Sequence, residues 1–149
     1  MALAPTVSVS GADAIKRGAT RCLRALEFSA IAELPLVTGR RVELMAVGPS
    51  GEILIVEIKS SAADFQSDLK WTEYRDYCDR FFFAVTRTFP HEIIPENAGL
   101  IVGDEYGAEL IRESEYIPLS AARRKAILIR FARHSADRYG NVIDSYKSE

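Results

Sequence analysis

Apolar residues recur along the chain with two different periods, and these periods divide it into helices and strands. Helix signals begin near residues 10–13 and are followed by apolar residues at helical spacing: Ile15, Ala19, Cys22, Leu23 and Leu26. Two later runs, which begin at Ile53 and Phe81, are apolar on both faces. This pattern predicts central strands of a sheet that is covered on both sides.

Turn residues separate these segments and set their order along the chain. Residues 48–51, Gly-Pro-Ser-Gly, predict a hairpin turn, and Gly140 is the kind of residue that ends a helix. After the first helix we expect strands over 28–36, 41–47 and 52–59, a helix over 65–78, a strand over 81–86, short strands over 99–102 and 108–111, and a helix from about 120 to 139. The order α-β-β-β-α-β with an extra C-terminal helix predicts an α/β fold with a mixed sheet flanked by helices.

The chain has 149 residues, 48% of them hydrophobic, which is enough for one domain with its own core. We expect a flexible leader over residues 1–10 and a single domain over residues 11–149. The formal net charge is −2, so a surface that binds a polyanion must be a local patch. The N-terminus does not resemble a signal peptide, and no run approaches the roughly 18 apolar residues of a membrane span. We therefore expect a cytoplasmic protein without membrane contact.

Two charged residues interrupt the apolar third strand. Glu57 and Lys59 are two positions apart, so their side chains point to the same face of a strand. Burying them is unfavourable unless they pair or bind a metal, and such local breaks in a folding pattern often mark function. The alternative is a solvent-exposed Glu–Lys pair, because so short a pattern also occurs often by chance.

Glu43 lies on the preceding strand, across the predicted hairpin. The turn places it opposite about residue 56, within one residue of Glu57. Two carboxylates and a main-chain carbonyl suit a hard divalent cation such as Mg²⁺, and the carbonyl of Ile58 is a candidate third ligand. A bound cation of this kind polarises a phosphoryl oxygen, and Lys59 could orient water or stabilise the phosphate in the transition state.

An acid on the second strand, a hairpin, and then an apolar residue followed by Glu57, one further residue and Lys59 resemble the restriction-endonuclease-like core of the PD-(D/E)XK nucleases. A longer pattern, over residues 39–46, 55–61, 64–65 and 70–74, resembles the MmcB family of bacterial DNA repair proteins, and this resemblance spans roughly residues 17–138. It implies hydrolysis of DNA phosphodiester bonds that depends on Mg²⁺ or Mn²⁺. It also implies catalytic roles for Glu43, Glu57 and Lys59, and metal ligation by Glu43, Glu57 and the Ile58 carbonyl.

The chain departs from the nuclease pattern in three places. Glu43 stands where the family has a metal-binding Asp, and Val42 replaces the proline beside it. Many relatives of this fold have a Glu on the first helix, where this chain offers Arg17 and Arg21. Glu33 on the first strand is the candidate substitute for that missing ligand.

Several basic and aromatic side chains are candidates for contact with DNA. One pair, one helical turn apart, resembles the Gln-x-x-x-Tyr element of RecB-type nucleases, and the final helix is the most basic stretch of the chain. The candidates are Lys70, Tyr74, Arg17, Arg21, Arg123 and Arg124. The alternative for both helices is one packed and one solvated face, and Trp71 is expected in the core.

Three functions are therefore open. The first is a metal-dependent DNA phosphodiesterase in DNA repair, carried by Glu43, Glu57 and Lys59. The second is a DNA-binding module that kept the nuclease fold but cuts weakly or not at all. The third is a protein-interaction domain, or a homodimer, that uses an exposed 81–83 segment or an unpaired edge strand.

Overall fold

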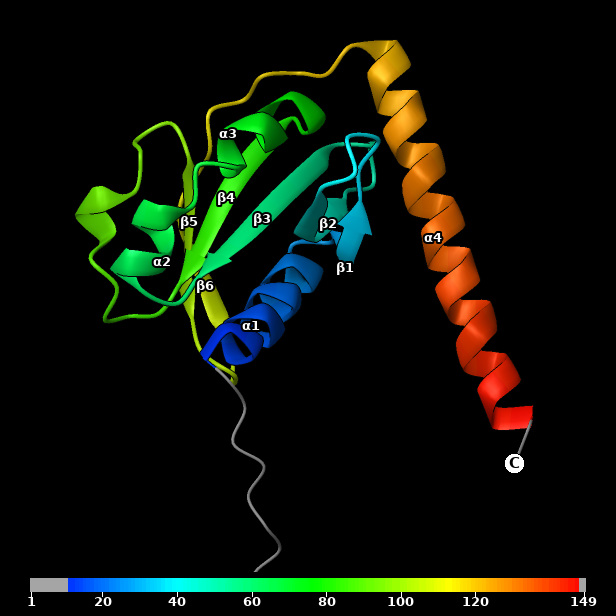
Figure 1. Ribbon diagram of the computed structural model, residues 1–149, viewed down its shortest axis with the longest axis horizontal. Helices are drawn as coiled ribbons and strands as arrows, with labels where there is room; N and C mark the ends of the chain where they lie inside the picture. The colour runs from blue at the N-terminus through cyan, green and yellow to red at the C-terminus, as the bar shows by residue number, and fades with distance from the viewer. Residues whose placement is uncertain (1–10, 148–149) are drawn as a thin grey trace, which may run out of the picture.

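The computed structural model describes residues 11–147, which form a six-stranded sheet with helices on both faces and a long helix beside one edge (Figure 1). The expected leader, residues 1–10, lies outside the described residues. The first elements are α1 (Gly11–Ala25), β1 (Ser29–Pro35), β2 (Arg41–Val47) and β3 (Ile53–Lys59). They are followed by α2 (Ala62–Ser67), α3 (Trp71–Tyr74), the 3-10 helix η1 (Arg75–Tyr77), β4 (Arg80–Val85), η2 (His91–Ile93), β5 (Gly99–Gly103), β6 (Ala108–Arg112) and α4 (Ala121–Lys147).

The strands lie side by side in the order in which they occur along the chain. β1, β2 and β3 form an antiparallel meander, β4 and β5 are parallel to β3, and β6 returns antiparallel to β5. The hairpin between β2 and β3 turns at Gly51, whose φ of +87° is a conformation that glycine adopts without strain. This order confirms the α/β core, the mixed sheet and the C-terminal helix that the sequence predicts.

The sheet has two apolar faces, and each is covered by different helices. On one face α1 packs through Ile15, Ala19 and Leu23. On the other face α2, α3 and part of α4 cover a larger core that includes Phe81 and Phe83. Trp71 stacks on Phe81 with 5.8 Å between ring centroids, so its expected place in the core is confirmed. Because residues 81–83 are buried, they offer no docking surface, and that part of the third expectation was wrong.

Two helix boundaries differ from the prediction. The helix expected over residues 65–78 is broken, because Asp68 is extended (φ −102°, ψ 110°) and ends α2. The last helix does not end at Gly140 but continues to Lys147. A single glycine within a helix costs about 1 kcal/mol, which a 27-residue helix tolerates. Figure 1 shows α4 running along the β1 edge, with its C-terminal end extending beyond α1.

No helix within residues 11–147 combines the length and the apolar composition needed to cross a membrane. The cytoplasmic location stays a prediction.

Candidate metal and nucleic-acid site

The third strand carries its two charged residues into the interior. Every residue of β3 is buried, and Glu57 and Lys59 each expose only 3% of their surface. They continue the row of Ile53 and Ile55, which belongs to the core beneath α2 and α3. A carboxyl group and an ammonium group therefore lie at the carboxyl end of a central strand, where water cannot solvate them well. The alternative of a solvent-exposed Glu–Lys pair was wrong.

The β2–β3 hairpin brings Glu43 to Glu57, as the sequence predicts. Leu44 lies opposite Val56, so the pairing differs by one residue from the expected register. The Glu43 backbone N–H donates to Glu57 Oε1 over 3.1 Å, and the two carboxyl groups lie close enough to shift each other's pKa. The main chain of Ile58 also lies near this pair and lowers the pKa of the Glu43 carboxyl group.

Two carboxyl groups so close together cannot both be charged at low cost. Burial raises the pKa of Glu57 to about 8, and the neighbouring Glu43 carboxylate adds to the rise. Burial also raises the pKa of Glu43. The nearby Lys59 ammonium lowers the pKa of both groups but does not cancel these effects. Glu57 therefore titrates close to neutral pH, and a pKa perturbed in this way is frequent among functional carboxylates.

Lys59 has an acidic partner that the sequence did not reveal. Its ammonium nitrogen lies 2.5 Å from Asp68 Oδ2 and 4.0 Å from Asp64 Oδ1. The other oxygen of Asp68 accepts the Lys70 N–H over 2.8 Å. Partial burial opposes the charge on Asp68, but Lys59 and the Lys70 N–H keep the pKa of its carboxyl below the ordinary value. The break between α2 and α3 therefore provides a carboxylate that holds the lysine in place.

Glu33 does not join the two other acids. It adopts a positive φ of 56° on β1, and its carboxylate pairs with Lys16 over 3.2 Å and with Arg41 over 3.6 Å. Within residues 11–147 no three acids, histidines or cysteines gather as a set of metal ligands. Two carboxylates still fit Mg²⁺ or Mn²⁺, because such a hard ion keeps several waters and usually takes one or two protein carboxylates. Ligation by Glu43, Glu57 and the Ile58 carbonyl stays a prediction.

The expected DNA contacts of α3 and α1 differ in exposure. Lys70 is exposed, whereas Tyr74 is buried and its hydroxyl donates to the Arg41 carbonyl over 3.2 Å. Burial raises the pKa of Tyr74 to about 12, and the nearby Glu57 carboxyl adds to the rise. Arg17 is exposed, and Arg21 donates to two carbonyl oxygens of the β5–β6 loop. Lys70 and Arg17 are therefore more accessible to a ligand than Tyr74, and all four roles stay predictions.

The two arginines expected to bind DNA from α4 have partners within the protein. Arg124 donates both terminal nitrogens to Asp79, over 2.6 Å each, and one of them also to the Gly51 carbonyl. Arg123 donates to the Asp76 carbonyl and stacks over the Tyr77 ring at 5.1 Å. Both side chains therefore fix the start of α4 on the sheet, and their role in DNA binding stays a prediction.

Comparisons with known proteins place the chain among relatives. A solved protein of unknown function from Silicibacter pomeroyi shares 42% identity and a TM-score of 0.87, covering 93% of this chain and 94% of that chain. A repair endonuclease from Pyrococcus abyssi aligns at 20% identity over 55% of this chain and 40% of that chain, with a TM-score of 0.33, too weak to carry an argument. Among curated proteins no match was found. The family described as DNA repair protein MmcB-like matches residues 4–145, which is nearly the whole chain, and the chain therefore belongs to this family of DNA repair proteins.

Proposed function

We propose that this protein hydrolyses DNA phosphodiester bonds in DNA repair, with Glu43, Glu57 and Lys59 at its centre. The observation that carries the proposal is the buried contact between the Glu43 and Glu57 carboxyl groups at the end of β3. Keeping two acids together in an apolar core is unfavourable unless something else compensates their charge. A divalent cation is the compensating group that this set of oxygen ligands fits.

Each residue has a distinct task in this proposal. Glu43 and Glu57 hold Mg²⁺ or Mn²⁺, which when bound polarises a phosphoryl oxygen and makes water a stronger nucleophile. Lys59 directs its positive charge to the phosphate oxygens, where negative charge develops. The Lys59 ammonium donates a hydrogen bond to Asp68, which keeps the long lysine side chain in one orientation. The buried aromatic rings beside β3 limit the access of bulk water.

A nicking assay tests this proposal directly. The full chain is incubated with Mg²⁺ or Mn²⁺ and with duplex, single-stranded and branched DNA, and compared with Glu57→Gln. We expect cleavage by the wild-type protein only with the metal, and a loss of at least about a hundredfold in the variant. Cleavage at the wild-type rate by Glu57→Gln would exclude this site from the reaction.

Glu109→Gln is the matched control. It makes the same chemical change at an exposed position of β6, on the far edge of the sheet. Its cleavage rate should equal that of the wild-type protein. A second readout does not depend on turnover: Mn²⁺ should raise the melting temperature of the wild-type protein and of Glu109→Gln, but not of Glu57→Gln.

A DNA-binding module that cuts weakly or not at all is the second candidate. Two observations favour it: Lys59 is already paired with Asp68, and Glu33 is paired with cations instead of joining the other two acids. This candidate predicts salt-dependent DNA binding that Glu57→Gln leaves unchanged, and at most weak cleavage with Mg²⁺ or Mn²⁺. Absence of DNA binding at low salt would exclude both candidates.

A further inference from the structure

The first half of α4 carries five basic residues and no acidic one between positions 121 and 133. In the sequence these residues look equivalent, but the structure separates the four arginines among them into two groups. Arg124 is paired with the buried Asp79, and Arg123 with the main chain and ring of η1. Further along, Arg138 donates to the carbonyl oxygens of Ala32 and Glu33. These three arginines attach the helix to the rest of the protein.

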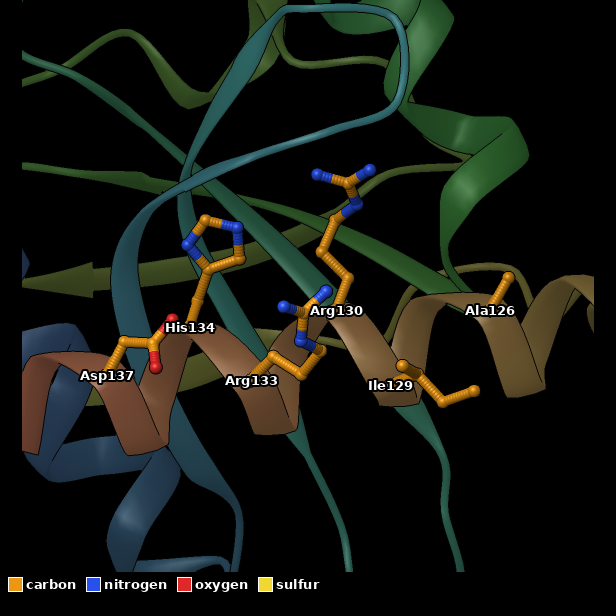
Figure 2. A pocket seen from close by; sticks show the side chains of 6 residues that line it. All are labelled: Ala126, Ile129, Arg130, Arg133, His134 and Asp137. Carbon is orange, nitrogen blue, oxygen red and sulfur yellow. The ribbon is translucent and has the colours of Figure 1, made fainter.

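A second group faces a cavity of about 390 Å³ along one stripe of α4. It consists of Arg130, Arg133 and His134, and Figure 2 shows Arg130 and His134 projecting from the helix with the Arg133 guanidinium between them. Arg130 uses one nitrogen for the Pro35 carbonyl over 3.3 Å. Within the part of the chain that the structure describes, Arg133 and His134 form no hydrogen bond or ion pair. Donors on three neighbouring side chains therefore remain available to a ligand.

We propose that this cavity, defined by Arg130, Arg133 and His134, binds a phosphodiester group of the nucleic-acid backbone. Guanidinium groups present planar pairs of N–H donors that match phosphate oxygens, and imidazole supplies at least one more N–H donor. Arg133 lines the cavity and is an exposed residue, so the cavity is accessible from solvent. A backbone that continues in both directions can therefore enter it.

One acidic residue narrows the choice of ligand. Asp137 lines the same cavity, one helical turn from Arg133. Its negative charge disfavours a doubly charged free phosphate more than a phosphodiester, which carries a single charge. The chemistry of the lining thus favours the backbone of a polynucleotide over a small phosphate ion.

Two strands, β1 and β2, connect the cavity beside α4 to the candidate metal site on β2 and β3. Arg138, about one helical turn beyond His134, binds the main chain at Glu33, and the Glu33 carboxylate pairs with Arg41 on β2. Glu43 is two residues further along β2. A nucleic-acid strand bound at Glu43 and Glu57 could therefore continue past Glu33 towards α4. Naming DNA as the ligand rests on the proposed function, but the binding site itself does not.

Equilibrium binding in EDTA tests the site without cleavage. Labelled duplex and single-stranded DNA are titrated by fluorescence anisotropy between about 50 and 300 mM salt. Over such a range counterion release changes the affinity for DNA by orders of magnitude. Arg133→Gln is compared with Lys125→Gln, which removes the same charge from an exposed position on another face of α4. Loss of one phosphate contact should reduce the salt slope by about 0.9 and weaken binding roughly fivefold to tenfold at low salt, whereas Lys125→Gln should change neither. Equal effects of the two substitutions would overturn the inference.

Asp137→Asn should change DNA affinity in the direction opposite to Arg133→Gln. Removing the carboxylate should tighten DNA binding about twofold to threefold, because it removes a repulsion from the bound phosphate. Unchanged or weaker binding would contradict the proposed lining. Inorganic phosphate, titrated alone and followed by the NMR signals of His134, distinguishes the two sources of the anion. Saturable phosphate binding that Arg133→Gln abolishes, together with unchanged DNA binding by that variant, would overturn the assignment to a polynucleotide.

The failure of this inference can be told apart from the failure of the proposed function. If Arg133→Gln and Lys125→Gln bind DNA alike while Glu57→Gln loses cleavage, the inference about α4 fails and the nuclease proposal stands. If Glu57→Gln cleaves at the wild-type rate while Arg133→Gln binds DNA more weakly than Lys125→Gln, the nuclease proposal fails and the inference about α4 stands.

Discussion

The buried carboxyl groups of Asp79 and Glu57 lie near opposite ends of β3. Their environments differ in the number of hydrogen-bond donors that they contact. Asp79 lies at the start of the strand, where its carboxylate accepts the N–H groups of Ile53 and Leu119 and both terminal nitrogens of Arg124. Glu57 lies at the end, where its carboxyl group accepts one backbone N–H and contacts a second carboxyl group. Burial raises the pKa in both places, yet the net shift is downward for Asp79 and upward for Glu57.

This difference shows that burial alone does not decide the charge of an acid. Asp79 is fully buried and still charged, because four hydrogen bonds, two of them from the Arg124 guanidinium, stabilise its negative form. Glu57 is almost equally buried, but the protein leaves its charge largely uncompensated. Asp79 therefore contributes to stability by joining β3 to α4. The Glu43–Glu57 pair costs stability, as is common where residues are arranged for a ligand.

The largest expected effect on the free energy of unfolding is at Asp79, beside the start of β3. Asp79→Asn should lower the free energy of unfolding by about 3 kcal/mol, because it leaves the Arg124 charge without its buried partner. Guanidinium-induced unfolding followed by circular dichroism measures the change. Asp76→Asn is the control, since the same substitution is made at an exposed position three residues earlier. A similar loss in both variants would contradict the role given to Asp79.

Substitution at the carboxyl end of β3 should increase the free energy of unfolding. Glu57→Gln should raise the free energy of unfolding by about 2 kcal/mol at pH 7 without metal, because it removes a carboxyl group whose charge is disfavoured in the fold. The amide oxygen can still accept the Glu43 N–H. The same unfolding experiment in EDTA provides the measurement. A destabilised variant would show that the carboxyl pair supports the fold, and the comparison drawn above would fail.

A smaller effect is expected from the residue that holds Lys59. Asp68→Asn should slow DNA cleavage at saturating substrate by about tenfold, equivalent to about 1.4 kcal/mol, because the lysine loses the carboxylate that fixes its direction. DNA affinity in EDTA should change by less than about twofold. Asp64→Asn, which removes the more distant carboxylate, should have a weaker effect than Asp68→Asn. Equal effects, or a loss of affinity alone, would remove Asp68 from the site.

The smallest expected effect is the pH dependence of the stability that the Asp79 carboxylate contributes. The folded pKa of Asp79 lies below its ordinary value near 4, so its contribution is complete above that pH and is lost as pH falls through the lowered pKa. The stability difference between the wild-type protein and Asp79→Asn should therefore shrink by about 1 kcal/mol between pH 5 and pH 3. Unfolding curves at each pH measure it. A constant difference would mean that the carboxylate is not stabilised in its charged form.

Much of the sheet and part of the site followed from local patterns. The apolar runs around Ile53 and Phe81 predicted the central strands, and the Gly-Pro-Ser-Gly turn placed Glu43 within one residue of Glu57. The alternation of side chains along a strand predicted that Glu57 and Lys59 share a face. These predictions succeeded because strand geometry and hairpin register are set by residues close in sequence.

Other features could not be predicted, because they depend on contacts between distant segments. Nothing near Asp68 in the sequence indicates that it interrupts a helix to pair with Lys59. Nor does the sequence distinguish Arg124, which is bound to Asp79 from 45 positions away, from Arg133, which faces an open cavity. Both arginines lie on the same amphipathic helix, and only their tertiary partners separate them.

The sequence by itself determined the order of helices and strands, the two-sided burial of β3 and the presence of two acids and a lysine beside one hairpin. These follow from periodicity and turn chemistry, which act over a few residues. The tertiary structure decided which charges are compensated and which are left for a ligand. That outcome depends on how many donors distant segments bring to each buried group, and this number exists only after the chain has folded.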